Sequence, residues 1–156
     1  MKIKNLYFSP VKSLSFNNVD TLEIIKNIGI KNDRIFAFTN NLNFEDIELI
    51  KNDPLKREIY KFLSLKKYPE LNQYNFLLED NFLILEFENK IILKTEIDNQ
   101  HEVKILCSKL EDILPNINKI NLLKDRVNPF FDTMPNKSIS LINLNSIKAV
   151  SYTHLT

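Results

Sequence analysis

Two short segments near the N-terminus carry the side chains best suited to chemistry. The first reads Ser-Pro-Val-Lys-Ser over residues 9–13 and offers Lys12 and Ser13, and the second reads Gly-Ile-Lys-Asn-Asp-Arg over residues 29–34 and offers Arg34. A guanidinium forms bidentate, charge-assisted hydrogen bonds to a phosphate, and an ammonium adds a compact charge. The three side chains, placed at neighbouring strand ends, would therefore form a pocket for a small anion. The same residues also fit an ordinary surface, with a solvated lysine, a serine in a turn and an arginine paired with a nearby acid.

The second segment contains Gly29, the only glycine of the chain. Average usage of about 7% would supply roughly eleven glycines in a chain of this length. A single glycine indicates a position that needs a positive φ, as in a tight turn. We expect that turn to deliver Asp33 and Arg34 to the start of a strand. Adjacent side chains on a strand point to opposite faces, so we expect Asp33 to accept backbone N–H groups of the turn rather than to neutralise Arg34.

Alternating apolar and β-branched residues predict a chain dominated by strands. The expected strands cover residues 3–8, 19–25, 34–38, 82–88, 90–95, 102–107 and 138–142. The expected helices are short and cover residues 53–61, 69–73, a stretch over 110–123 that Pro115 interrupts, and a segment that begins near 143. The fold class that follows is mainly β with α+β character.

Composition excludes several classes of function. The chain has 156 residues, 44% of them hydrophobic, and its 21 basic and 20 acidic residues leave a net charge near +1, which argues against nucleic-acid binding. No apolar run approaches the roughly 18 residues of a membrane span. One cysteine cannot form an internal disulfide, so a cytoplasmic location is expected. One glycine excludes glycine-rich nucleotide loops, and two histidines with one cysteine, widely spaced, exclude a structural zinc site.

The ordered set of motifs resembles a known family. An apolar strand, Pro-Val-Lys-Ser, and a Gly-x-x-x-Asp-Arg turn into an aromatic strand are similar to the N-terminal β-rich module of MOSC proteins, which bind the molybdenum cofactor. Residues 62–66 (Phe-Leu-Ser-Leu-Lys) resemble a Phe-Leu-x-Leu-Arg segment of the family, with Lys66 where arginine is usual. Residues 131–132 (Phe-Asp) and 140–146 (Ser-Leu-Ile-Asn-Leu-Asn-Ser) resemble the entry into the catalytic MOSC domain. The likeness extends from Ile3 to about residue 150.

The resemblance implies a small barrel-like antiparallel or mixed sheet over residues 1–130 and the start of a truncated catalytic domain over 131–156. It also implies that Lys12, Ser13 and Arg34 hold the anionic phosphate end of the molybdenum cofactor (molybdopterin). The parent enzyme would reduce small N-hydroxylated substrates or transfer sulfur, and a redox partner protein would be possible. Neither nucleic acid nor a membrane is an expected partner.

The cysteine that binds molybdenum in this family falls well downstream of the segment at 140–146, so Cys107 does not match it. On its expected strand Cys107 shares a face with Val103 and Ile105 and is interpreted as a buried, inert thiol. The chain alone is therefore not expected to catalyse molybdenum chemistry. Two other functions remain open: a non-catalytic β module that packs on a partner protein, and a binder of a small anion or phosphorylated metabolite.

Overall fold

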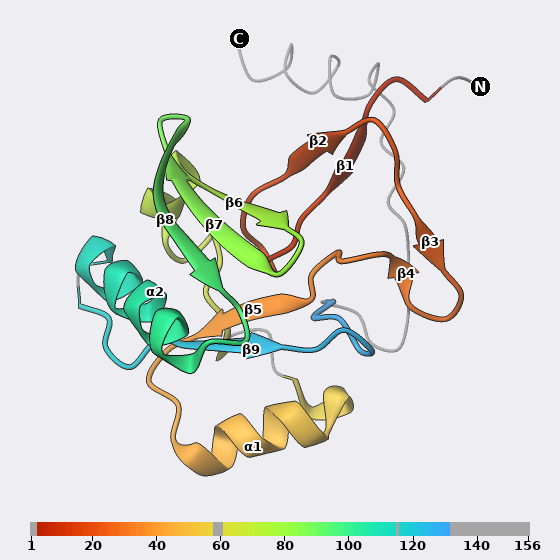
Figure 1. The fold of residues 1–156 in the computed structure, drawn as a ribbon. Helices are drawn as coiled ribbons and strands as arrows, with labels where there is room; N and C mark the ends of the chain where they lie inside the picture. Colours follow the sequence, from red (N-terminus) through yellow and green to blue (C-terminus); the bar gives the residue numbers. More distant parts are fainter. Residues whose placement is uncertain (1–2, 58–60, 115, 132–156) are drawn as a thin grey trace, which may run out of the picture.

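The fold is a set of small sheets with two helices, shown in Figure 1. The structure is a computed structural model, and it describes residues 3–57, 61–114 and 116–131. The strands are β1 (Leu6–Phe8), β2 (Asn17–Val19), β3 (Ile24–Ile25), β4 (Gly29–Ile30), β5 (Phe36–Thr39), β6 (Tyr74–Glu79), β7 (Phe82–Phe87), β8 (Lys90–Glu96) and β9 (Asn121–Lys124). The helices are α1 (Phe44–Asn52) and α2 (Gln100–Ile113), accompanied by short 3-10 turns at Pro54–Lys56 and Pro69–Gln73.

The strands pair in the antiparallel sense in four separate sheets. The largest has the order β6-β7-β8, and the others are the pairs β1-β2, β3-β4 and β5-β9. The class predicted from sequence, mainly β with α+β character, is confirmed. The described part of the chain contains no helix long and apolar enough to cross a membrane.

The expected barrel-like closure is wrong for the described residues, whose sheets do not join into a closed barrel. A barrel needs each edge strand to pair with the next. At the edge of β6, the backbone groups of Phe76 are instead hydrogen-bonded to the side chains of Ser15 and Asn17. The N–H of Phe76 donates to Ser15 Oγ over 2.8 Å, and its carbonyl accepts from Asn17 Nδ2 over 2.8 Å. Side chains therefore occupy backbone groups that a neighbouring strand would need.

Strand β5 lies at the centre of the molecule and is buried on both faces. Phe36 and Phe38 belong to the main apolar core, whereas Ala37 faces a second, smaller cluster that includes Phe62 and Phe130. In Figure 1 the β5-β9 pair lies between the β6-β7-β8 sheet and α1. The two-residue alternation of a strand explains how one segment contributes to two cores.

Local turn signals in the sequence are confirmed. Gly29 has φ +108°, as the single-glycine argument required. The hairpin of β7 and β8 turns at Glu88 and Asn89, both with positive φ. Asparagine replaces glycine at several other turns, where Asn27, Asn32, Asn41 and Asn116 also have positive φ. Asparagine tolerates the left-handed region better than most residues, so a chain with one glycine can still make many tight turns.

The strand predicted over residues 102–107 is wrong, because these residues belong to α2. Asn99 caps this helix by accepting hydrogen bonds from the N–H groups of His101 and Glu102. The buried residues Leu106 and Leu110 are four positions apart, as an amphipathic helix requires. The helix ends at Ile113, before the proline at position 115. The helical stretch expected over 110–123 is therefore wrong at its C-terminal end, where residues 121–124 form β9.

The helix predicted over residues 53–61 is also placed wrongly. The helix of this region, α1, precedes it, and Asn43 caps α1 by accepting from Asp46 N–H over 2.7 Å. The Asp53–Pro54 opening does act as expected, since Asp53 accepts from Leu55 N–H, but it begins only a 3-10 turn. The short helix expected at 69–73 is confirmed.

Two further strands are shorter than predicted. The expected strand 19–25 is divided between the end of β2 and the two residues of β3, and the strand expected from Arg34 begins at Phe36. The strand at 138–142, the helix from 143 and the domain division at 130/131 depend on residues outside the described ranges.

Candidate functional site

The two motifs singled out from the sequence are direct neighbours in the fold. Phe36 N–H donates to the carbonyl of Pro10 over 3.0 Å, and Lys12 N–H donates to the carbonyl of Phe36 over 2.8 Å. A parallel bridge joins Val11 to Phe36 in the same stretch. Arg34 N–H donates to the carbonyl of Ser9. Residues 9–12 therefore run alongside the entry to β5, and this brings Lys12 and Arg34 onto adjacent segments.

Lys12 is a buried cation, with only 3% of its surface exposed. Its Nζ donates a hydrogen bond to the carbonyl of Phe130 over 3.3 Å and lies 5.5 Å from the centre of the Phe62 ring. Both groups attract an ammonium, the first through a carbonyl lone pair and the second through the negative face of the ring. The next residue, Ser13, is half-buried and has φ +59°, so it lies in the turn that follows Lys12.

Arg34 is paired with its neighbour Asp33, contrary to the expectation that the two would point apart. Its Nη1 donates to Asp33 Oδ2. The reason is local: Arg34 has φ +52° and precedes the strand, so the alternation of strand side chains does not apply to it. The guanidinium also lies over the ring of Phe131, 5.2 Å from its centre, and 29% of the side chain remains exposed.

Asp33 performs the turn-stabilising task predicted for it in addition to this ion pair. Its Oδ1 accepts from the N–H of Ser9 over 2.8 Å, which ties the two motifs together. Burial raises the pKa of the Asp33 carboxyl, and the hydrogen bond from Ser9 and the charge of Arg34 offset only part of that effect.

Lys12 and Arg34 meet on one dipeptide, Phe130–Phe131. Lys12 contacts the carbonyl of Phe130, while Arg34 stacks on the ring of Phe131 and accepts a hydrogen bond at its own carbonyl from Phe130 N–H over 2.8 Å. The sequence-predicted cations are thus gathered in one region rather than at opposite sides of the molecule, with Ser13 in the adjoining turn.

A third cation, Arg57, supports this dipeptide and was not predicted. It is 3% exposed in its side chain, it lies 4.3 Å from the ring centre of Phe130, and it pairs with Asp125 over 2.5 Å. It also donates to the carbonyls of Ile50 and Asn128. The sequence contains one signal for this residue, the scarcity of arginine: only three of the 21 basic residues are arginine, and the other eighteen are lysine. Retaining arginine in so lysine-rich a chain indicates a need for its planar, multidentate group.

The other candidates considered from the sequence have structural or surface roles. Cys107 is buried at 7% exposure, and desolvation raises the pKa of its thiol to about 11, so it is not a thiolate at neutral pH. Lys66 is exposed in a turn. Among the described residues, no group of histidine, cysteine, aspartate and glutamate side chains is arranged to hold a metal ion.

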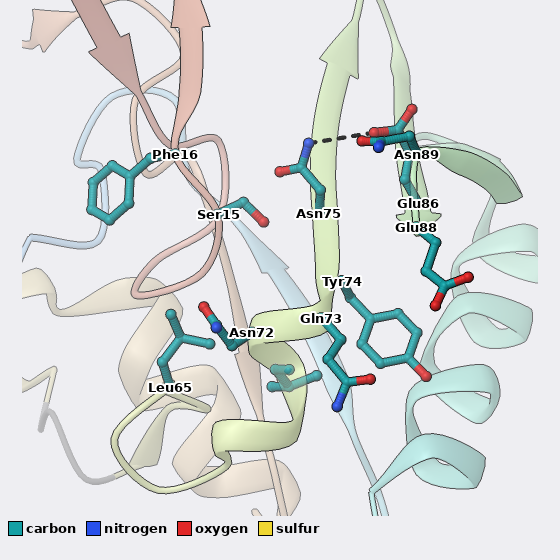
Figure 2. A pocket seen from close by; sticks show the side chains of 11 residues that line it. Ser15, Phe16, Leu65, Asn72, Gln73, Tyr74, Asn75, Glu86, Glu88 and Asn89 are labelled. Carbon is teal, nitrogen blue, oxygen red and sulfur yellow. Dashed lines mark hydrogen bonds between the residues drawn. The ribbon is translucent and has the colours of Figure 1, made fainter.

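A groove of about 280 Å³ lies at the edge of β6, and neither Phe130 nor Phe131 lines it. Figure 2 shows the side chains that do. Its polar lining includes the carboxylates of Glu86 and Glu88, and Asn75 donates to Glu86 over 3.4 Å. The described residues that line it include neither lysine nor arginine. This groove is therefore unsuited to an anion, and the region around Lys12 and Arg34 is the better candidate for a phosphate.

Comparison of the chain with family models, with curated proteins and with solved structures yields no significant match.

Proposed function

We propose that this chain is the cofactor-anchoring N-terminal part of a MOSC-type, molybdenum-cofactor-binding oxidoreductase. In this proposal Lys12, Ser13 and Arg34 hold the anionic phosphate end of the molybdopterin. The observation that carries it is the convergence of Lys12 and Arg34 on the Phe130–Phe131 dipeptide. The family resemblance of these same residues supports it.

The donor chemistry of the three residues fits a phosphate monoester. The guanidinium of Arg34 is partly exposed, and its bond to Asp33 uses only one of its five N–H donors. Lys12 adds an ammonium with three donors, one of which reaches the carbonyl of Phe130. The hydroxyl of Ser13 adds a neutral donor next to Lys12. A phosphate dianion would compensate positive charge in a region where burial makes electrostatic interactions strong.

The residues named here would hold the cofactor and would not carry out its redox step. When bound, the molybdenum of this cofactor supplies the electron-transfer or sulfur-transfer chemistry of the family. Cys107 is no candidate metal ligand, because its thiol is buried and no group of potential ligands is gathered around it among the described residues. The proposal includes a cytoplasmic setting, in which a free buried thiol is normal, and leaves a redox partner protein as a possible further component.

A retention experiment tests the proposal. The purified chain is incubated anaerobically with molybdenum cofactor released from a donor molybdoenzyme, passed through a desalting column, and assayed for bound pterin by fluorescence after oxidation. The wild type should retain pterin, and Arg34→Ala and Lys12→Met should each lower retention at least about tenfold, since a charge-assisted bond contributes about 1.5–3 kcal/mol. The matched control is Arg126→Ala, which removes an exposed arginine.

Two results would reject the proposal. Retention by Arg34→Ala equal to that of the wild type would remove Arg34 from the site. If the wild type retains no pterin but simple phosphate monoesters raise its thermal unfolding midpoint, the chain is better explained as a binder of phosphorylated metabolites.

A further inference from the structure

We propose that the Phe130–Phe131 dipeptide positions the two cations, and that the ring of Phe131 sets the orientation of the Arg34 guanidinium. This inference rests on the proposed function for its ligand, an anion at Lys12 and Arg34. It assigns positioning roles to residues that the sequence motifs of the site do not include.

Phe131 and Asp33 together restrict the position of the Arg34 guanidinium. The ring lies under it at 5.2 Å, and Asp33 holds one of its terminal nitrogens. Because the guanidinium is planar, its remaining N–H donors lie in its own plane while Asp33 is bonded at one end. An oxyanion would therefore meet the guanidinium edge-on, which is the geometry of bidentate recognition.

The contacts of Phe130 act on Lys12 in a corresponding way. The Phe130 carbonyl accepts a hydrogen bond from Lys12 Nζ. The Phe130 ring packs edge-on against the Phe62 ring, with 5.6 Å between the ring centres. The Lys12 ammonium lies 5.5 Å from the centre of that Phe62 ring. Two consecutive residues thus define the surroundings of both cations. Because one peptide joins them, a shift of this segment would move both positions together.

The dipeptide is itself held by groups outside the site. Arg57 stacks on the Phe130 ring at 4.3 Å, and Phe131 N–H donates to the carbonyl of Pro129 over 2.9 Å. A Cβ added at Gly29 would lie 3.9 Å from Phe131 Cζ, so the tip of the ring lies beside the glycine turn. The single glycine of the chain, Arg57 and the two cations are thereby connected through one aromatic pair.

The test observes Arg34 directly and does not require activity. In a ¹⁵N-labelled full chain, the Nε–Hε signal of wild-type Arg34 should be displaced by the ring current of Phe131. Phe131→Leu should return that signal to its position in an unfolded chain, and Phe131→Tyr should preserve the displacement. Phe16→Leu, the same substitution at a phenylalanine that is 67% exposed, is the control and should leave the signal unchanged.

The same samples are then titrated with inorganic phosphate at constant ionic strength. Phe131→Leu should weaken phosphate binding about threefold to tenfold, because it removes the cation–π contact that orients Arg34. Phe131→Tyr should bind phosphate like the wild type.

An Arg34 signal that is identical in wild type and Phe131→Leu would overturn the positioning role, as would equal phosphate affinity in the two. If the signal moves as expected but the wild type shows no response to phosphate, the Arg34–Phe131 contact is supported and the proposed anion site is overturned.

Discussion

Arg57 offers the sharpest test of how the candidate site is held together. The perturbation is Arg57→Met, which keeps much of the length of the side chain and removes its charge and its donors. In the structure these donors reach Asp125, the carbonyl of Ile50 and the carbonyl of Asn128, and the group also stacks on Phe130. The substitution would leave a carboxylate and two carbonyls without this partner.

The magnitude follows from burial. Breaking a buried ion pair by removing one partner costs about 3–5 kcal/mol. Because Asp125 is 17% exposed and can recover some hydration, we expect a loss of about 3 kcal/mol in the free energy of unfolding. A urea slope of about 1–3 kcal/mol/M would then lower the unfolding midpoint by roughly 1–3 M. Arg57→Lys keeps the charge without the planar fork and should lose less, about 1–2 kcal/mol.

The assay is urea unfolding followed by circular dichroism, with Arg126→Met as the exposed control. That control should change stability by no more than about 0.5 kcal/mol. Asp125→Asn combined with Arg57→Met should lose less than the sum of the two single changes, by about 1–3 kcal/mol, because the partners share one interaction. If Arg57→Met is as stable as Arg126→Met, the contacts of Arg57 do not stabilise the fold.

Four other outcomes are expected. Burial raises the pKa of the Cys107 thiol to about 11. At pH 8 this thiol should therefore react with a disulfide reagent at least about 100-fold more slowly in the native protein than in denaturant, and equal rates would show an accessible thiol. Burial raises the folded-state pKa of Asp33 above 3.8, so the folded form binds this proton more tightly than the unfolded chain. The stability of the wild type relative to Asp33→Asn should therefore fall as pH rises above 3.8, measured by urea unfolding at successive pH values, and a rise would contradict the assigned direction. Gly29→Ala should lower the free energy of unfolding by about 1–2 kcal/mol, because φ is +108° while the added Cβ meets only an ordinary contact; an unchanged urea midpoint would show that the turn relaxes. Asn99→Ala should cost about 1 kcal/mol through the lost cap of α2, and an unchanged thermal midpoint would contradict that role.

Several parts of the fold could be predicted because their causes are local. The hairpin of β7 and β8 depends on alternation and on a two-residue turn, and both are legible in the sequence. The positive φ of Gly29, the 3-10 turn at 69–73 and the capping role of Asp53 likewise involve only neighbours in the chain. Even the burial of Cys107 was predicted correctly, although the element that carries it was not.

Errors arose where local patterns were ambiguous. Residues 102–107 alternate well enough for a strand, yet the cap at Asn99 and the pair Leu106 and Leu110 favour a helix, and Ile105 is left 44% exposed. Short apolar runs fit both periods, and packing against the rest of the molecule decides between them.

Residue types and local turn signals alone identify the side chains whose donors suit an anion: a lysine and a serine after the first strand, and an arginine at the end of a glycine turn. Long-range packing buries Lys12, pairs Arg34 with Asp33, and brings both cations to one aromatic dipeptide, 118 residues beyond Lys12 at Phe130 and 97 beyond Arg34 at Phe131. The physical reason is that side-chain type and turn propensity depend on near neighbours. The partners of a charge depend instead on which distant segments the two apolar cores bring together.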